Sequence, residues 1–259
     1  GSILDRAGNA GVLTLGAPGS ETSLAGNKDL VIDTALPAAV SVTSLNVENG
    51  SYGIGDGTNF HITFNEPVTV TGTPLLALET GENDGSAFYI AGSGTDVLTF
   101  SWTITEGHAS ADLDYVSTEA LTLNGGTINN SVGNAAILIL PNPGDAGSLS
   151  ANKDIVIDGI RPSNAQNFTA SSSSISSITL TWDPVTDEDL SFYRIFNATT
   201  IELLGTVNAG TETFIHSNIL ANTEYSYSIV SLDQTGNLSS GNSIGTLSNP
   251  IVWSIIPGC

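Results

Sequence analysis

The sequence predicts an all-β chain built from antiparallel β-sandwiches in tandem, with an elongated arrangement. Three observations support this fold class. Short segments in which apolar and polar residues alternate recur along the 259 residues, separated by turn sequences rich in Gly, Asn and Asp. No stretch of about ten residues shows the periodicity of a helix. Finally, residues 3–37 align with residues 128–162 without a gap, and about half of the positions are identical.

The duplication predicts how the chain divides into modules. Both copies contain Asn-Lys-Asp, at 27–29 and 152–154, and both reach a proline shortly after an aspartate, Asp33 or Asp158. A gap-free match of this length indicates tandem duplication. We therefore expect four segments. They are the C-terminal part of a truncated repeat (1–37), a complete repeat (38–161), a module of different sequence (162–250) and an apolar tail leading toward missing downstream sequence (251–259).

The complete repeat contains eight segments that alternate like strands. They are 41–47, 60–70, 74–80, 87–92, 97–105, 120–123, 136–140 and 154–157. The sequences between them, such as Gly-Ser-Gly-Thr-Asp at 92–96, are typical of turns. Many short strands with turn signals between them are typical of a sandwich of two antiparallel sheets.

Several motifs of this repeat point to a known class. They include Phe-Asn-Glu-Pro-Val at 64–68, Gly-Ser-Gly-Thr-Asp at 92–96, Asp-Leu-Asp-Tyr at 112–115 and Gly-Asn-Ala at 133–135. With these motifs the repeat resembles the tandem Ig-like, cadherin-like repeats of large bacterial surface adhesins. The resemblance covers residues 38–161 and, through the duplication, residues 1–37. It implies an Ig-like sandwich in a bacterial surface or secreted protein.

The third segment has a different sequence character. Its strand-like stretches are 177–184, 190–197, 201–207, 213–217 and 224–239. The stretch from Leu220 to Tyr225 is similar to the tyrosine corner of fibronectin type III domains, although it is one residue shorter and lacks the usual proline. Residues 233–239 fit the turn between the last two strands of bacterial members. On these features 162–250 is identified as a fibronectin type III domain.

The charge balance excludes several partners. There are 26 acidic and 5 basic side chains, giving a formal net charge of −21. So few cations cannot neutralise a run of phosphates, which argues against nucleic acid and against anionic membrane surfaces. No apolar run reaches the roughly 18 residues of a membrane-spanning helix, so membrane insertion is not expected. The lone Cys259 excludes an intrachain disulfide. This composition favours a secreted or cell-surface location on a bacterium.

No catalytic constellation is evident, and we expect the chain not to be an enzyme. Residues 241–245 match G-x-S-x-G, but that motif requires a strand-to-helix turn and here lies in a predicted edge strand. The three histidines, His61, His108 and His216, are far apart in the sequence. Short turns between strands also leave no long loops from which a cleft for paired carboxylates would be built.

Calcium is the one cofactor that the sequence suggests. The six candidate ligands are Asp33, Asp56, Glu66, Asp112, Asp114 and Asp158. Two residues apart in an extended segment, Asp112 and Asp114 point to the same side. Ca²⁺ prefers hard oxygen ligands, and the resemblance to cadherin-like arrays implies calcium where Asp33 and Asp158 meet the linkers. The alternative is that these residues are turn formers with local backbone hydrogen bonds.

The functional hypothesis is a non-catalytic stalk or adhesion segment of a large modular bacterial surface or fibre protein. It would support attachment to a cell-surface protein or glycan of a target cell, through modules outside this fragment. The prolines of the linkers 34–37 and 159–162 restrict hinge motion. The alternative is an accessory region, either carbohydrate-binding or a spacer, of a secreted polysaccharide-degrading enzyme. A third hypothesis is self-association through the unpaired strands 12–15 and 29–32 or through the apolar tail.

Overall fold

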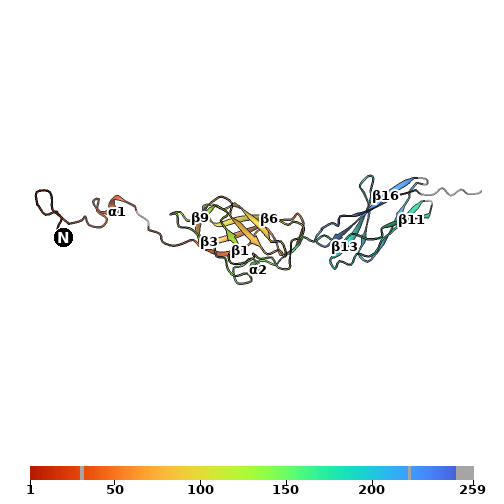
Figure 1. Cartoon of the computed structure of the whole chain (residues 1–259), viewed down its shortest axis with the longest axis horizontal. Coiled ribbons are helices and arrows are strands. Elements are labelled where there is room, and N and C mark those ends of the chain that lie inside the picture. Colours follow the sequence, from red (N-terminus) through yellow and green to blue (C-terminus); the bar gives the residue numbers. More distant parts are fainter. Residues whose placement is uncertain (30–31, 175, 221–222, 249–259) are drawn as a thin grey trace, which may run out of the picture. The chain divides into compact units, whose positions relative to one another are not determined.

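Two β-sandwiches with separate hydrophobic cores follow an N-terminal segment. The computed structural model describes residues 1–29, 32–174, 176–220 and 223–248. The chain divides into the units Gly1–Leu36 and Pro37–Cys259. Within the second unit, one core extends from Val42 to Ile157 and the other from Ala165 to Ile229 (Figure 1). In the described part of the chain, no helix has both the length and the apolar character needed to span a membrane.

Residues 38–161, the repeat sandwich, contain a seven-stranded and a three-stranded sheet. Their strands are β1 (Ala39–Thr43), β2 (Gly50–Gly53), β3 (Gly57–Thr71), β4 (Leu75–Leu78), β5 (Gly85–Ala91), β6 (Thr95–Thr103), β7 (Ala109–Ser110), β8 (Leu121–Thr122), β9 (Thr127–Asn129) and β10 (Ile155–Asp158). The large sheet has the order β1-β3-β6-β5-β4-β8, with β9 paired to β3, and the small sheet has the order β2-β10-β7.

Alternation of side chains places the core of this sandwich. Along β3, Phe60, Ile62 and Phe64 are at most 2% exposed, while the residues between them face outward or lie half-buried. Phe60 pairs directly with Phe100 of the neighbouring strand β6. Because side chains of this size each contribute about 1.5–3 kcal/mol on full burial, this pair of central strands supplies a large part of the stability of the sandwich.

The small sheet differs from the purely antiparallel arrangement that the sequence predicts. Strand β10 pairs parallel to β2, with Ile155 opposite Gly50 and Asp158 opposite Gly53. The predicted strand at 136–140 is present only as an isolated bridge between Ala38 and Ile137. The sequence continues Pro-Asn-Pro, and prolines cannot donate to a ladder, so this segment does not extend into a regular strand.

A short helix leads into the last strand of the repeat sandwich. Helix α2 (Leu149–Asn152) is capped by Ser148, whose side chain accepts from the N–H of Ala151. Nδ2 of Asn152 donates to the carbonyl of Val42 over 2.8 Å, and Nζ of Lys153 donates to the carbonyl of Val47 over 2.8 Å. The duplicated Asn-Lys pair therefore connects the end of the repeat to its first strand and to the segment that follows that strand.

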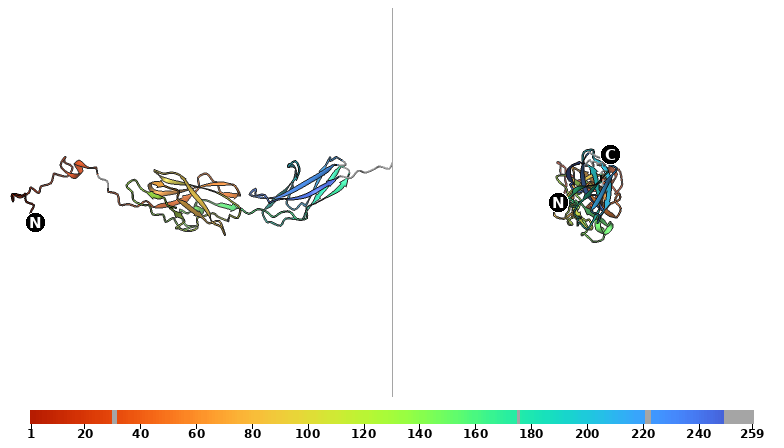
Figure 2. Two further views of the ribbon diagram at one scale, coloured as in Figure 1. Left: turned by 45° about the horizontal axis from the view of Figure 1, so that its top comes forward. Right: turned by 90° about the vertical axis from the view of Figure 1, so that its right-hand side faces the viewer.

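The N-terminal segment (residues 1–36) has the local structure of its duplicate at 128–161. Helix α1 (Leu24–Asn27) is capped by Ser23, as α2 is by Ser148. The bridge between Leu4 and Ala10 corresponds to that between Asn129 and Ala135. Within the described residues 1–29 and 32–36 there is no strand (Figures 1 and 2). The strand expected at 12–15 is therefore absent, and half of the one expected at 29–32 lies outside the described residues.

The apolar side chains of this segment are uncovered. Leu24 is 69% exposed, whereas its counterpart Leu149 is 0% exposed, and Ile32 is 88% exposed, whereas Ile157 is 2% exposed. In the complete repeat the counterparts pack into the core that strands β1 to β9 build. The local hydrogen bonds of this segment thus form without a sandwich core beside them, but burial of its apolar side chains requires such a core.

Residues 162–248, the second sandwich, contain a three-stranded and a four-stranded sheet. The strands are β11 (Thr169–Ser174), β12 (Ser177–Thr181), β13 (Leu190–Asn197), β14 (Glu202–Asn208), β15 (Thr213–Ser217), β16 (Glu224–Asp233) and β17 (Asn242–Ser248). The sheet orders are β11-β12-β15 and β14-β13-β16-β17. The apolar tail expected at 251–259 lies outside the described residues.

The core of the second sandwich has the aromatic features that the sequence predicts. Trp182 is 5% exposed and its ring meets that of Tyr193 edge-on, with centroids 5.2 Å apart. The hydroxyl of Tyr225 accepts a hydrogen bond from the backbone N–H of Leu220 at 3.0 Å. The tyrosine therefore bonds back to upstream backbone even though its loop is one residue short.

Candidate functional site

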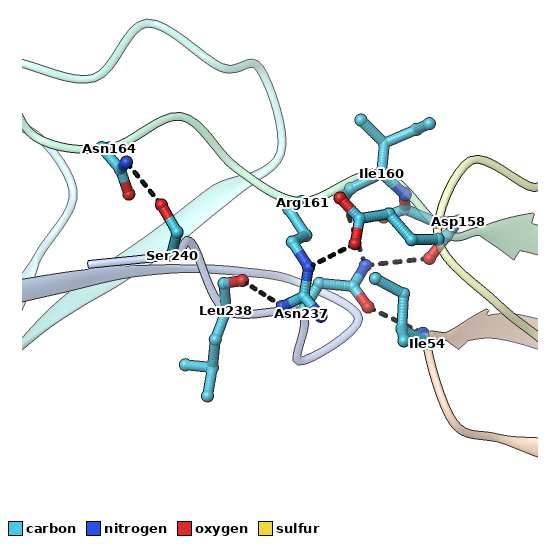
Figure 3. Close-up of polar contacts among 9 residues, drawn as sticks. Ile54, Asp158, Ile160, Arg161, Asn164, Asn237, Leu238 and Ser240 are labelled. Carbon is cyan, nitrogen blue, oxygen red and sulfur yellow. Dashed lines mark hydrogen bonds and ion pairs between the residues drawn. The ribbon is translucent and has the colours of Figure 1, made fainter.

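Asn237 connects the two sandwiches at their junction. It lies in the turn between β16 and β17 and is 4% exposed. Its Oδ1 accepts a hydrogen bond from the N–H of Ile54 at 2.7 Å, and its Nδ2 donates to the carbonyl of Asp158 at 2.8 Å (Figure 3). Ile54 and Asp158 belong to the repeat sandwich, whereas Asn237 belongs to the second. One buried amide therefore pairs backbone groups from two segments of the neighbouring module.

The turn that carries Asn237 is ordered by a carboxylate. Oδ1 of Asp233 accepts hydrogen bonds from the N–H groups of Thr235 and Asn237, both at 2.9 Å. Gly236 has a φ of 95°, a conformation that glycine adopts readily and other residues rarely do. The turn expected between the last two strands is present, and its own hydrogen bonds direct Asn237 at the repeat sandwich.

On the facing side, Gly53 leaves room for this contact. A Cβ atom at this position would lie 2.9 Å from Oδ1 of Asn237 and 3.0 Å from the carbonyl oxygen of Thr235. Carbon atoms do not approach oxygen this closely without displacement of one or the other. Glycine at position 53 is therefore what permits the turn of the second sandwich to touch β2.

Arg161 forms a second connection through the linker. Its Nε donates to Oε2 of Glu106 at 3.0 Å, and its Nη1 donates to the carbonyl of Leu238 at 2.7 Å (Figure 3). The side chains of Arg161 and Glu106 are 39% and 67% exposed, so this ion pair contributes little to stability by itself. Its effect is directional, because one guanidinium reaches a side chain of the repeat and a carbonyl of the second sandwich.

Three carboxylates meet beside Asn237. Asp158 ends β10, Asp189 immediately precedes β13, and Asp233 ends β16. One carboxylate oxygen from each lies within 4.8 Å of the others. The hydroxyl of Thr235 lies 2.9 Å from Oδ2 of Asp158 and 2.8 Å from Oδ1 of Asp233. A single hydroxyl proton cannot serve both carboxylates fully.

The electrostatics of this group reflect crowding of like charge. Burial raises the pKa of Asp189, and the carboxylates of Asp158, Asp233 and Asp187 raise it further, while a hydrogen bond to its own backbone opposes them. Oδ2 of Asp233 is buried and accepts no hydrogen bond from any residue that the structure describes. An all-oxygen donor set with one buried oxygen left over fits a hard cation such as Ca²⁺.

Of the six ligands expected from the sequence, Asp158 is the one placed in a group of three carboxylates within the described residues. Asp33, its counterpart in the duplication, makes the same local turn. Oδ1 of Asp33 accepts from the N–H of Ala35 at 3.0 Å, as Oδ1 of Asp158 does from Ile160 at 3.2 Å. The duplicated position therefore keeps its hydrogen bond in both copies.

Asp112 and Asp114, expected to act together, have different environments. Asp112 is exposed, and slight desolvation of its carboxyl, together with the charges of Asp154 and Asp114, raises its pKa. Asp114 is 7% exposed, and its carboxylate accepts five hydrogen bonds. The donors are the N–H groups of Tyr115, Gly144, Leu149 and Ser150 and the hydroxyl of Ser150. These bonds engage Asp114 with the loop that begins α2.

The remaining two candidates, Asp56 and Glu66, have separate surroundings. Oδ2 of Asp56 accepts the N–H of Gly53 at 2.9 Å and so closes the turn that faces Asn237. Glu66 lies on β3, where its Oε2 is 3.5 Å from Nδ2 of Asn130 and its Oε1 is buried without a partner among the described residues. Asp56 thus shapes the junction through the backbone.

Sequence reasoning missed Asp189 and Asp233. Asp233 was recognised as the start of a turn, and Asp189 sits in an acidic run at 187–189 that gave no spacing signal. They lie 44 positions apart and converge because β13 and β16 are paired antiparallel, with Leu190 opposite Asp233. The sequence did place both residues next to predicted strands, at the end of the module that is nearest the linker, and this placement could have indicated that they lie close together.

The residues considered for catalysis are dispersed. His61 lies on β3, His216 on β15 and His108 in the turn after β6. Burial lowers the pKa of all three. The G-x-S-x-G stretch runs into β17, which forms the edge of its sheet as expected, and the side chains of 242–248 are outside the described part.

These features define the chain as a modular protein of tandem β-sandwiches with a polar junction. Residues 162–246 match the family described as the fibronectin type III domain, and this part of the chain is a fibronectin type III domain. The match does not extend to the repeat sandwich. No curated protein matches the chain by sequence.

Solved structures with similar folds include multidomain and single-domain proteins. A crystal structure of three consecutive titin domains is 14% identical with a TM-score of 0.43, covering 82% of this chain and 68% of that one. The FN1–FN3 domains of chicken CNTN1 are 12% identical with a TM-score of 0.38, covering 80% and 68%. The fibronectin domain of the human collagen alpha-1(XX) chain is 16% identical with a TM-score of 0.32, covering 38% and 94%.

Proposed function

We propose that this chain is a non-catalytic spacer segment of a large modular surface or fibre protein of a bacterium. The observation that carries the proposal is the junction around Asn237, where side chains of one sandwich pair backbone groups of the next. A linker of four residues, 159–162, leaves little slack between them. Modules joined in this way transmit position and stiffness along a stalk, while binding to a target is left to other parts of a protein.

The resemblance of the repeat to Ig-like, cadherin-like adhesin repeats supports the same proposal. Under this proposal, the parent protein is secreted or held at the bacterial outer surface and attaches to a protein or glycan of a target cell. The shortage of basic residues agrees with this role, because a chain of net charge −21 does not adhere to anionic lipids or nucleic acid. The uncovered apolar side chains of residues 1–36 offer a surface for association between chains.

NMR relaxation of the ¹⁵N-labelled chain tests the spacer role. If the junction is stiff, the repeat sandwich and the second sandwich tumble with one common correlation time. Asn237→Ala removes the hydrogen bonds of this side chain to Ile54, Asp158 and Ile160 and separates the two correlation times. Asn218→Ala, at an exposed position of the same module, leaves them equal. Independent tumbling of the two sandwiches in the unmodified chain would contradict the proposal.

The alternative, a carbohydrate-binding accessory region of a secreted polysaccharide-degrading enzyme, receives less support. Such a site needs a planar row of exposed aromatic rings. Five of the tryptophan and tyrosine rings of the chain are instead at most 6% exposed, namely Trp102, Tyr115, Trp182, Tyr193 and Tyr227. Trp253 lies outside the described residues. Binding of this fragment to an array of polysaccharides would favour the alternative over the spacer role.

A further inference from the structure

We propose that Asp158, Asp189 and Asp233 bind one calcium ion that links the two sandwiches. Asp158 comes from the repeat sandwich, and the other two residues come from the fibronectin type III domain. A cation held by all three would be coordinated by both modules at once. This calcium site deepens the proposed function. Only the consequence of binding, a stiffer junction, rests on that function, because ion binding itself is measured separately.

The first observation is the convergence of the three carboxylates. Their nearest oxygens all lie within 4.8 Å of one another. Two oxygens bound to the same Ca²⁺ at about 2.3–2.6 Å are at most about 5 Å apart, so this spacing accommodates calcium. Calcium also tolerates an irregular set of oxygen ligands, whereas Mg²⁺ demands near-ideal octahedral geometry.

The second, independent observation is the free oxygen of Asp233. This residue is 2% exposed, and its Oδ1 already accepts hydrogen bonds from Thr235 and Asn237. Its Oδ2 has no partner among the described residues. A buried carboxylate oxygen without a donor is unfavourable, because the water it has lost is not replaced. A cation beside Asp158 and Asp189 would supply what that oxygen lacks.

The local charge also calls for a cation. None of the three carboxylates forms an ion pair within the part of the chain that the structure describes. The nearby guanidinium of Arg161 is engaged with Glu106 and with the carbonyl of Leu238. Three carboxylates without a counter-charge repel one another, and a divalent ion neutralises most of that charge.

One of the three carboxylates, that of Asp189, borders a cavity. This cavity of about 420 Å³ lies along the linker and is lined by Ile160 to Ser163 and by Thr186 to Asp189. Asp158 and Asp189 are half-buried, whereas Asp233 is buried. Water in this cavity would offer further oxygen ligands on the side of Asp189, toward the about six to eight that calcium takes.

Isothermal titration of calcium chloride into the chelator-treated whole chain tests the proposal. The matched variants are Asp189→Asn and Glu188→Gln, which remove the same charge from adjacent positions. Asp189 is the ligand chosen because its carboxylate orders no turn, unlike that of Asp233. We expect binding in the range of about 10⁻⁴–10⁻³ M, typical of extracellular modules. The expected effect of Asp189→Asn is at least tenfold weaker binding, with Glu188→Gln within about twofold of the unmodified chain.

Thermal denaturation with and without calcium gives a second readout. The unmodified chain and Glu188→Gln should melt at a higher temperature with calcium, and Asp189→Asn should show no such shift although it remains folded. Absence of calcium binding by the unmodified chain, or equal binding by Asp189→Asn, would overturn the cation site. Neither result bears on the common correlation time of the two sandwiches, so the spacer role stands or falls separately.

Discussion

The backbone N–H of Ile54 donates a hydrogen bond to Oδ1 of Asn237 over 2.7 Å, across 183 positions of sequence and from one sandwich to the other. Asn237 is buried and Ile54 is half-buried, so leaving either polar group without its partner costs up to about 1–3 kcal/mol. A junction sealed by such bonds resists bending, because opening it exposes polar groups that must be rehydrated. The linker between the sandwiches therefore acts together with a specific interface.

Gly53→Ala tests how closely the two modules must approach. The added Cβ would lie 2.9 Å from Oδ1 of Asn237, so either the turn of the second sandwich or β2 must move. We expect a loss of about 1–3 kcal/mol in the free energy of unfolding, typical of overpacking, together with faster amide exchange at Ile54. Hydrogen exchange followed by mass spectrometry measures both effects.

The matched control for this change is Gly57→Ala. The nearest atom to a Cβ at position 57 is the carbonyl oxygen of Trp102, at 4.0 Å. This substitution should leave exchange at Ile54 unchanged. Equal effects of the two alanines would mean that contact with Asn237 is not what restricts position 53.

Leu149→Ala and Leu24→Ala test the uncovered state of residues 1–36. The two leucines occupy the same position of the duplicated sequence, but Leu149 is 0% exposed and Leu24 is 69% exposed. We expect Leu149→Ala to lower the free energy of unfolding of the repeat sandwich by about 2–5 kcal/mol. Leu24→Ala should change it by less than about 0.5 kcal/mol. Denaturant unfolding is the measurement, and a large effect at Leu24 would show that it is buried in solution, for example against a second chain.

Asp114→Asn distinguishes a structural carboxylate from a metal ligand. Asp114 accepts five hydrogen bonds, four of them from the loop at 144–150. In asparagine one carboxylate oxygen is replaced by an NH₂ group, which cannot accept hydrogen bonds from these N–H and O–H groups. We therefore expect the free energy of unfolding of the repeat sandwich to fall by about 2 kcal/mol. The loss should be the same with calcium and with chelator. A loss seen only with calcium would instead assign Asp114 to an ion site.

Much of the fold follows from alternation and turn residues. The segment 190–197 coincides with β13, and 213–217 coincides with β15, because each alternates cleanly between two turns. Strands β2, β7 and β9 were not predicted. They are two to four residues long, too short for alternation to show, and form because neighbouring strands offer them backbone partners.

The junction was less accessible to sequence reasoning. The duplication marked Asp158 as a module end, but Asp189 and Asp233 are brought to it by pairing of β13 with β16. Likewise, Asp112 and Asp114 have the spacing of a paired site, yet one is exposed and the other is enclosed by loop N–H groups. Spacing predicts which side chains share a side of a strand, whereas coordination depends on which loops pack together.

Tyr225→Phe tests the shortened tyrosine corner. The hydroxyl accepts the N–H of Leu220 at 3.0 Å, and phenylalanine keeps the ring while removing that acceptor. We expect a loss of about 1 kcal/mol in stability of the second sandwich, with the repeat sandwich unaffected. Domain-resolved hydrogen exchange measures it. Tyr52→Phe, which removes a hydroxyl bonded to the carbonyl of Glu48 in the repeat, is the control and should leave the second sandwich unchanged.

His216 makes the second sandwich sensitive to acid. Burial lowers its pKa, against a smaller opposing effect of Glu202, and its Nδ1 lies 2.9 Å from the hydroxyl of Tyr227, whose own pKa burial raises to about 12. The unfolded chain therefore binds a proton at His216 more tightly than the folded chain does. The contribution of neutral His216 to the free energy of unfolding is present above the ordinary histidine pKa of 6.5 and is lost as pH falls through the pKa of His216 in the folded chain. We expect the melting temperature of the second sandwich to fall on acidification below pH 6.5, and His216→Gln to reduce the dependence of that temperature on pH.

His61→Gln, at a histidine whose pKa burial also lowers, is the control and should alter only the repeat sandwich. An unchanged slope in His216→Gln would show that other groups cause the acid sensitivity.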